Sequence, residues 1–162
     1  MQCPCGLELT YAQCCQPLIM ATTSANSPEQ LMRSRYSAYA TKNAEYIYLT
    51  YAKASQLEQS IVDIEQWAAQ TKWLKLFIHK ASEYQKNKIN KESAQVEFSA
   101  FYQHQGQIWQ MRENSNFVIE DNAWRYLDGD VSDSKVLIKP KRNDTCFCQS
   151  NKKFKQCCAK AF

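Results

Sequence analysis

Eight cysteines divide into two groups of four, one at each end of the 162-residue chain. In both groups the second cysteine lies two residues after the first, the third lies nine residues after the second, and the fourth follows directly. No cysteine occurs between residues 16 and 145. Because the spacing is repeated, we expect the same small structure at both ends. It would be built on Cys3, Cys5, Cys14 and Cys15 and on Cys146, Cys148, Cys157 and Cys158.

The cysteine spacing favours metal binding over disulfides or scattered core thiols. A disulfide framework needs an oxidising compartment, and the first residues lack the basic and apolar segments of a signal peptide. We therefore expect a cytoplasmic protein. Adjacent cysteines such as Cys14 and Cys15 also do not readily bond within normal disulfide geometry. Four soft thiolates suit zinc in a tetrahedral shell, with iron less favoured, so we predict two zinc ions per chain, each in a four-cysteine site.

We interpret both zinc sites as structural. Four thiolates leave no open position on the ion, and neither His79 nor His104 lies near a cysteine group in the sequence. Metal binding would supply on the order of 10 kcal/mol to a segment too small to fold around its own core. With three glycines the chain also has no phosphate-binding glycine loop, and the sequence assigns no catalytic residue.

Charge is unevenly distributed along the chain. Residues 1–134 carry a net charge of −3, whereas residues 135–162 carry eight basic residues and one acidic residue, a net charge of +7. A basic segment on a slightly acidic body indicates contact with an anionic partner, such as RNA, an acidic protein surface or lipid headgroups. The alternative is a solvated tail that binds nothing. The candidate docking residues are Lys141, Arg142, Lys152, Lys153 and Lys155.

The C-terminal cysteines lie in a segment that resembles the SEC-C motif, named for the C-terminal zinc knuckle of the SecA secretion ATPase. The segment reads Arg142-Asn143-Asp144-Thr145-Cys146-Phe147-Cys148-Gln149-Ser150-Asn151-Lys152-Lys153-Phe154-Lys155-Gln156-Cys157-Cys158. It departs from the motif at Phe147, where proline is usual, and at Gln149 and Asn151, where glycines are usual. Asparagine tolerates a left-handed backbone, whereas glutamine would adopt it with strain.

A second, looser copy of the motif begins with Cys3-Pro4-Cys5-Gly6 and passes Tyr11 to reach Cys14-Cys15. In this copy Leu7, Glu8 and Leu9 stand where the motif has serine, glycine and lysine. The N-terminal copy therefore lacks the positive charge of the C-terminal copy.

Zinc knuckles at both ends of so short a chain resemble the YchJ family of bacterial proteins. Two internal stretches are similar to the middle region of that family, namely Leu31-Met32-Arg33-Ser34-Arg35-Tyr36-Ser37-Ala38-Tyr39 and Trp124-Arg125-Tyr126-Leu127-Asp128-Gly129. The resemblance implies a nuclear-transport-factor-2-like cone, also described as a cystatin-like roll, in which a curved antiparallel sheet wraps over a long helix. We expect knuckles at residues 1–20 and 140–162 and the middle domain at residues 25–134.

Periodicity in the middle of the chain independently favours an α+β fold. Ser27-Pro28-Glu29-Gln30 is a capping box with proline at the first helical position, and it predicts a helix that ends near Thr41. Shorter helices are expected at residues 44–51 and 61–69. Beyond Trp73 the pattern changes towards period two.

The second half of the middle region predicts a strand meander. Apolar and polar residues alternate at residues 94–102, and strands are also expected at residues 108–119 and 123–128. Turns are expected at Gln105-Gly106 and at residues 120–122. Helices followed by a meander are typical of the α+β class.

Alternation on the strand at residues 108–119 places Glu113 and Ser115 on a face that is otherwise large and apolar. On the next strand, Asp128 shares a face with a tryptophan and a tyrosine. A buried carboxylate is costly unless it is paired or hydrogen-bonded. One interpretation is a small-molecule pocket lined by Arg35, Glu113, Ser115 and Asp128, in which a carboxylate acts as acid or base. The other is a bulge that turns Glu113 to the surface, or structural pairing with Arg33 or Arg35.

Three functions are compatible with these features. The sequence favours a non-enzymatic zinc-binding adaptor that docks through its C-terminal knuckle. By resemblance to SecA, whose knuckle docks on a chaperone and the translating ribosome, the partner would be a secretion- or ribosome-related protein or RNA. The second function is a small-molecule-binding protein or an isomerase or hydro-lyase that uses the cone interior. In the third, the zinc ions only brace the chain termini.

Two further expectations concern assembly and membranes. Exposed aromatic residues on cone-shaped sheets often pair, so both a monomer and a homodimer are compatible with the sequence. No apolar run approaches the length of a membrane-spanning helix, so no span is predicted.

Overall fold

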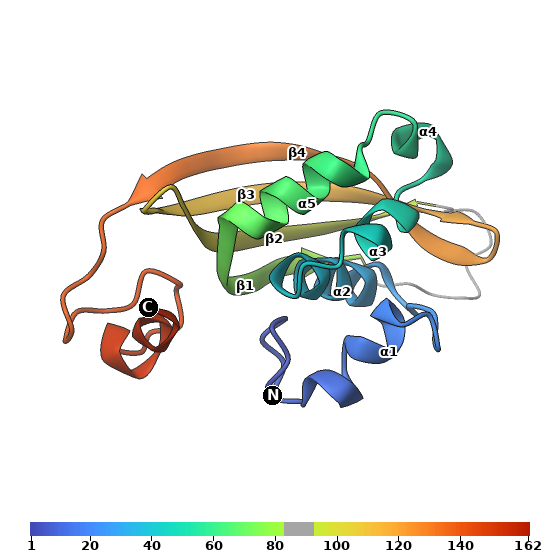
Figure 1. Cartoon of the computed structure of the whole chain (residues 1–162). Coiled ribbons are helices and arrows are strands. Elements are labelled where there is room, and N and C mark those ends of the chain that lie inside the picture. Colours follow the sequence, from blue (N-terminus) through green and yellow to red (C-terminus); the bar gives the residue numbers. More distant parts are fainter. Residues whose placement is uncertain (83–92) are drawn as a thin grey trace.

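The protein is built on one antiparallel sheet whose strands follow one another in chain order (Figure 1). The structure is a computed structural model and describes residues 1–82 and 93–162. The sheet arches over the helices, which confirms the predicted α+β class (Figure 1). Its strands are β1 (Thr71–Ala81), β2 (Ser93–His104), β3 (Gln107–Glu120) and β4 (Ala123–Leu137).

The two tight turns of the sheet use residues with a left-handed backbone. Gln105 and Gly106, with φ of 49° and 78°, join β2 to β3, and Asp121 and Asn122, with φ of 50° and 59°, join β3 to β4. Two-residue turns with positive φ at both positions match the twist of antiparallel strands. Both turns were expected from the sequence, and both are confirmed.

Helix α2 (Pro28–Ala40) begins at the predicted capping box and packs against the concave face of the sheet. The Ser27 hydroxyl accepts a hydrogen bond from the Gln30 backbone at 3.1 Å, which satisfies one of the free amides of the first turn. The helix contributes apolar side chains at helical spacing to the main core. This core includes Leu31, Met32, Tyr36, Val96, Phe98, Phe117 and Trp124.

Shorter helices surround α2, and one of them ends earlier than the sequence predicts. Helix α3 ends at Leu49 rather than Tyr51 because the following backbone pairs with β4. Ala52 donates a backbone hydrogen bond to Tyr126 at 2.7 Å, and Tyr126 donates one to Thr50 at 2.9 Å. The elements outside the sheet are η1 (Tyr11–Gln13), α1 (Gln16–Ile19), α3 (Ala44–Leu49), α4 (Lys53–Gln56), α5 (Ile61–Gln70), η2 (Phe154–Gln156) and η3 (Cys158–Ala161).

Strand β4 is longer than expected. It continues from the predicted end at Asp128 to Leu137, and it pairs with β3 along its whole length. Its second half is polar and mostly exposed, as suits the edge strand of a sheet. Because this half is polar, its sequence has no apolar alternation from which a strand could be predicted. The domain boundary expected at residue 134 falls within the strand.

The two terminal segments pack on different parts of the domain. The N-terminal cysteines contact α2, α3 and α5 through a cluster that includes Ala38, Ile47 and Ile64. The C-terminal cysteines form a cluster with Phe101 of β2, which is fully buried. The neighbours of Phe101 in the strand, Ala100 and Tyr102, point to the opposite, concave face of the sheet. None of the described helices is long and apolar enough to cross a membrane.

Candidate functional site

The eight cysteines form two compact clusters of sulfur atoms. Within each cluster the four Sγ atoms all lie within 4.8 Å of one another. The Sγ atoms of Cys5 and Cys14 are 3.6 Å apart, and those of Cys148 and Cys157 are 3.4 Å apart. A tetrahedral shell with Zn–S bonds of about 2.3 Å has sulfur–sulfur edges of about 3.8 Å. Both clusters therefore match the size of a four-thiolate metal site.

The two knuckles have matching local folds. In each, a short antiparallel bridge precedes a single 3-10 turn that leads to the adjacent cysteines; the bridges pair Gln2 with Thr10 and Thr145 with Lys153. The residue after the second cysteine has a left-handed backbone in both, with φ of 88° at Gly6 and 62° at Gln149. Asn151 also adopts a left-handed backbone, as expected, with φ of 57°.

The ionisation of the thiols indicates that each cluster is suited to a divalent cation. A hydrogen bond from Cys15 lowers the pKa of Cys5 to about 5, and one from Cys158 lowers the pKa of Cys148 to about 4. Burial raises the pKa of Cys14 to about 12, and the hydrogen bond to Cys148 raises the pKa of Cys158 further. Four close thiols thus favour one thiolate without an ion, whereas a divalent metal stabilises all four as thiolates.

The donor set fits zinc and has the character of a structural site. Both clusters consist of cysteine alone, and no histidine or carboxylate joins them within the described residues. Four thiolates close the tetrahedral shell and leave no position for a substrate. Bound there, zinc would cross-link two short segments rather than activate water.

The N-terminal cluster is anchored to α2 by polar contacts. Cys3 Sγ lies 3.7 Å from Ser37 Oγ, and Arg33 donates a hydrogen bond to the Cys5 carbonyl at 3.0 Å. Arg33 also pairs with Glu29 at 2.7 Å. Arg33 therefore serves the N-terminal knuckle and does not pair with Glu113, which was one of the structural explanations for that buried carboxylate.

The C-terminal cluster has an apolar inner side and a basic outer side. Phe147 and Phe154 belong to the same cluster as Phe101 of β2, with the Phe101 and Phe147 ring centroids 5.8 Å apart. None of the candidate docking residues forms an ion pair with a described residue. All five of them, Lys141, Arg142, Lys152, Lys153 and Lys155, are exposed.

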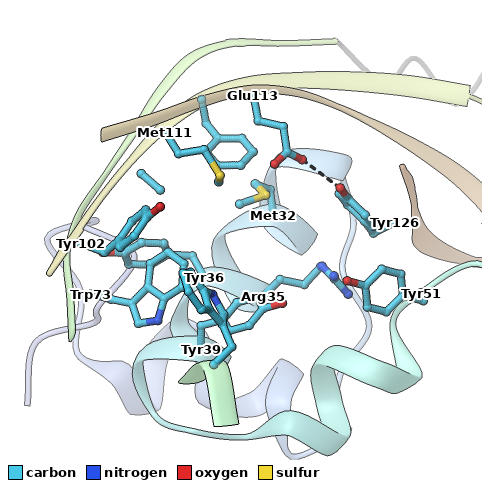
Figure 2. Close-up of a pocket in the computed structure, with 13 residues that line it drawn as sticks. Met32, Arg35, Tyr36, Tyr39, Tyr51, Trp73, Tyr102, Met111, Glu113 and Tyr126 are labelled. Atoms are coloured by element: carbon cyan, nitrogen blue, oxygen red, sulfur yellow. Dashed lines mark hydrogen bonds between the residues drawn. The ribbon is translucent and has the colours of Figure 1, made fainter. Parts of the chain in front are cut away.

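A cavity of about 320 Å³ lies between the concave face of the sheet and the helices (Figure 2). Arg35 and Glu113 both line it, so the structure brings together two of the four residues predicted for a pocket. The complete lining is Met32, Arg35, Tyr36, Tyr39, Tyr51, Trp67, Trp73, Phe98, Ala100, Tyr102, Met111, Glu113 and Tyr126.

Glu113 points inward and is held by two hydroxyl groups. Its Oε1 accepts hydrogen bonds from Ser115 at 2.6 Å and from Tyr126 at 2.9 Å (Figure 2 shows the second). Ser115 is thus buried beside the cavity as a partner of Glu113 and is not part of its lining. Gly129 completes this arrangement, because a Cβ atom at this position would overlap Glu113 Oε1. Burial and the neighbouring carboxylate raise the pKa of Tyr126 well above its ordinary value, which keeps its hydroxyl a donor.

Asp128 lies outside the cavity, which corrects the expected face of this residue. It is exposed and accepts a hydrogen bond from Asn116 at 2.5 Å. The cause is a register shift in which Asn116 pairs with Asp128 and Phe117 pairs with Tyr126, so that Leu127 is an extra residue in β4. An extra residue reverses the alternation of side chains beyond it. Tyr126 therefore faces inward and Asp128 faces outward.

Sequence reasoning missed the aromatic wall of the cavity. Trp67 comes from α5, and Trp73 of β1 pairs with Tyr102 of β2. Trp73 Nε1 is buried and has no hydrogen-bond partner among the described residues. The alternation of apolar and polar residues indicated that Tyr102 faces inward. Whether α5, β1 and β2 bring their aromatic rings together depends on tertiary packing, which the sequence pattern does not show. A second signal was available, because both stretches that resemble the YchJ middle region reach this cavity, through Arg35 and Tyr126.

Family models match both the middle domain and the two cysteine clusters of this chain. A family model described as "YchJ, middle NTF2-like domain" matches residues 27–129, and the SEC-C motif matches residues 2–17 and 142–160. These matches define an NTF2-like domain between two SEC-C motifs. The chain belongs to the YchJ family, which confirms the resemblance inferred from the sequence.

Relatives and solved structures extend the match over most of the chain. A UPF0225 protein of Vibrio cholerae is 38% identical over 158 residues, covering 98% of this chain and 99% of the relative. A UPF0225 protein of Shewanella sp. strain MR-4 is 40% identical, covering 98% and 96%. The crystal structure of a SEC-C motif containing protein from Psychrobacter arcticus is 32% identical with a TM-score of 0.67, covering 99% and 96%. The solution structure of a SEC-C motif containing protein from Rhodopseudomonas palustris is 34% identical with a TM-score of 0.73, covering 82% and 100%.

Proposed function

We propose that this protein is a non-enzymatic zinc-binding adaptor of the cytoplasm that docks on an acidic protein surface through its C-terminal knuckle. The main observation in support is that the knuckle has an apolar side packed on the sheet and a basic side exposed to solvent. Its phenylalanines pack on Phe101, whereas the five candidate docking residues are exposed and without ion pairs to described residues. Bracing the domain and docking therefore use different sides of one small structure.

An acidic protein fits this surface better than RNA does. Recognition of single-stranded RNA commonly uses exposed aromatic rings on which bases stack. Phe154 is buried and Phe147 is half-buried against the sheet, so neither ring is free to stack on a base. The third ring of the knuckle, Phe162, is exposed, but it packs against Phe154 and the Lys139 ammonium group lies 4.3 Å from its centroid. A compact set of lysine and arginine side chains instead favours a carboxylate-rich surface, through contacts that salt weakens.

The test measures, by fluorescence anisotropy, how tightly the zinc-loaded full chain binds a labelled polyglutamate peptide and a labelled polyuridylate RNA. The variant K152E/K155E reverses two charges on the knuckle, and K42E/K80E reverses two exposed lysines of the body as the matched control. We expect the knuckle variant to bind polyglutamate at least about tenfold more weakly than the control variant. Binding of the unmodified chain is also expected to weaken as salt is raised.

Three results would overturn the proposal. Binding to RNA alone would replace the acidic protein with a nucleic acid. Equal losses in the two variants would remove the knuckle from the contact. Binding of neither probe would leave the zinc ions with a bracing role only.

A further inference from the structure

The cavity contains one cation and one anion that do not pair with each other. Arg35 and Glu113 both line it, with 4% and 8% of their surface exposed. Across the described residues, no ion pair joins Arg35 to any carboxylate. A buried charge without a counter-charge is costly. The two groups therefore mark the positions at which the cavity would attract opposite charges.

Arg35 is held in place through one of its three guanidinium nitrogens. It donates hydrogen bonds to the Ile47 carbonyl and to Thr50 Oγ1, both at 2.7 Å and both from Nη1. The centroids of the Tyr51 and Tyr126 rings lie 4.3 Å and 4.6 Å from the guanidinium carbon, which fixes its orientation (Figure 2). A guanidinium has five N–H donors, and neither Nε nor Nη2 donates a hydrogen bond to a described residue, so these two nitrogens can bind an anion.

Glu113 has a complementary free atom. Both of its hydrogen bonds, from Ser115 and Tyr126, are accepted by Oε1. The other carboxylate oxygen makes no hydrogen bond to a described residue, so it can accept a donor from a ligand. Tyr126 connects the two charged groups, because its ring lies against Arg35 and its hydroxyl binds Glu113.

The rest of the cavity suits a compact apolar group. Its wall is largely aromatic and also contains Met32 and Met111. At about 320 Å³ it lies at the small end of the range for ligand sites, which is roughly 300–1,000 Å³. Trp67 is 36% exposed, so one edge of the lining reaches the surface. The space fits a molecule about the size of phenylalanine.

We propose that this cavity binds a free α-amino acid with an aromatic or other large apolar side chain. The α-carboxylate binds Arg35, the α-ammonium group binds Glu113, and the side chain lies among the aromatic and methionine residues. A simple anion or a simple cation would leave one of the two protein charges unpaired, whereas a zwitterion pairs both. This site goes beyond the docking function and uses no residue of either knuckle.

Three probes separate the contributions of the two charges. L-Phenylalanine carries both charges, 3-phenylpropanoate lacks the ammonium group, and 2-phenylethylamine lacks the carboxylate. Each is titrated into the zinc-loaded full chain and followed by calorimetry and by the tryptophan fluorescence of Trp67 and Trp73, which line the cavity. We expect L-phenylalanine to bind at least about tenfold more tightly than either analogue.

Glu113→Gln tests the ammonium contact without removing the acceptor that binds Ser115 and Tyr126. We expect this variant to bind L-phenylalanine about tenfold more weakly and to lose the preference over 3-phenylpropanoate. Asp128→Asn is the matched control, because it neutralises an exposed carboxylate on the neighbouring strand. Ala100→Leu adds volume to the cavity wall and is expected to weaken all three probes, which would locate the site.

The proposal fails if L-phenylalanine shows no saturable binding or binds no better than 3-phenylpropanoate. It also fails if Glu113→Gln and Asp128→Asn change the affinities equally. Preference for 3-phenylpropanoate would assign the cavity to carboxylic acids, and preference for 2-phenylethylamine would assign it to amines. Either result contradicts recognition of a zwitterion.

Discussion

The N-terminal and C-terminal knuckles have the same cysteine spacing and similar local folds, but they differ in the charge of their surfaces. Residues 1–20 contain no lysine or arginine, and Glu8 is their one charged side chain. The C-terminal knuckle presents Lys152, Lys153 and Lys155 to solvent. The spacing of the ligands therefore specifies the metal site, whereas the residues between the ligands determine what the surface of the knuckle can bind.

The knuckles also brace different parts of the domain. The N-terminal cluster packs with α2, α3 and α5, and two of these helices, α2 and α5, also line the cavity. The C-terminal cluster instead contacts the sheet through Phe101. Loss of the first metal site is therefore expected to loosen the helices, and loss of the second is expected to free a terminal segment.

The largest expected effect is a difference between two equivalent cysteine substitutions. Cys15→Ser in the N-terminal cluster is expected to destabilise the whole domain by on the order of 5 kcal/mol, because metal binding and helix packing are lost together. Cys158→Ser is expected to destabilise the sheet and helices by less, because it exposes the contact at Phe101 but leaves the helices packed. Thermal unfolding followed by circular dichroism measures both. Equal losses of stability would show that the two braces are equivalent.

The next effect isolates the contact between the C-terminal knuckle and the sheet. Phe101→Ala removes a fully buried ring from this contact and is expected to cost about 3 kcal/mol. The zinc content is expected to stay the same, because no ligand is changed. Phe77→Ala on β1, where the ring is 37% exposed, is the control and is expected to cost much less. Loss of zinc in Phe101→Ala would mean that the knuckle cannot form without the sheet.

A smaller effect concerns the equivalent backbone positions Gly6 and Gln149, which both have positive φ. Gln149→Gly is expected to stabilise the C-terminal knuckle by about 1 kcal/mol, since glycine adopts this conformation without strain. Gly6→Ala is expected to destabilise the N-terminal knuckle by a similar amount, because alanine adopts a positive φ only with backbone strain. No steric clash is added, since the nearest atom to the new Cβ would be Lys75 Nζ at 3.5 Å. Competition with a zinc chelator measures both changes. Changes of the same sign would contradict this account.

The two sites are expected to differ least in their response to acid. Metal binding must displace protons from thiols such as Cys14, whose pKa burial raises to about 12, so zinc affinity falls as pH falls. Burial likewise raises the pKa of Cys146 in the C-terminal site. Both ions are therefore expected to be lost as the pH is lowered, and native mass spectra of the unmodified chain across a pH series measure the loss. An ion whose occupancy does not fall with pH would contradict binding by four thiolates.

Much of this structure could be predicted because its signals are local. The cysteine spacing indicated both sulfur clusters, the capping box at Ser27 placed the start of α2, and Gln105-Gly106 placed a tight turn. Each depends on residues close together in the sequence. The same holds for the left-handed backbone at Asn151.

The parts that could not be predicted depend on pairing between distant residues. The extra residue Leu127 in β4 turned Asp128 out of the cavity, and nothing near it in the sequence marks the register shift. The exposed half of β4 has no alternating pattern because neither face of the sheet is buried there. The aromatic wall requires Trp67 and Trp73 to meet Tyr102, which comes from the separate strand β2.

The most direct test of the central claim is native mass spectrometry of the full chain purified without chelator, beside the variant C157S/C158S. We expect two zinc ions in the unmodified chain and one in the variant, with the variant still folded. The same spectra report whether the chain forms a dimer. A chain without metal, or a variant that loses both ions together, would contradict the claim that two separate zinc knuckles flank this domain.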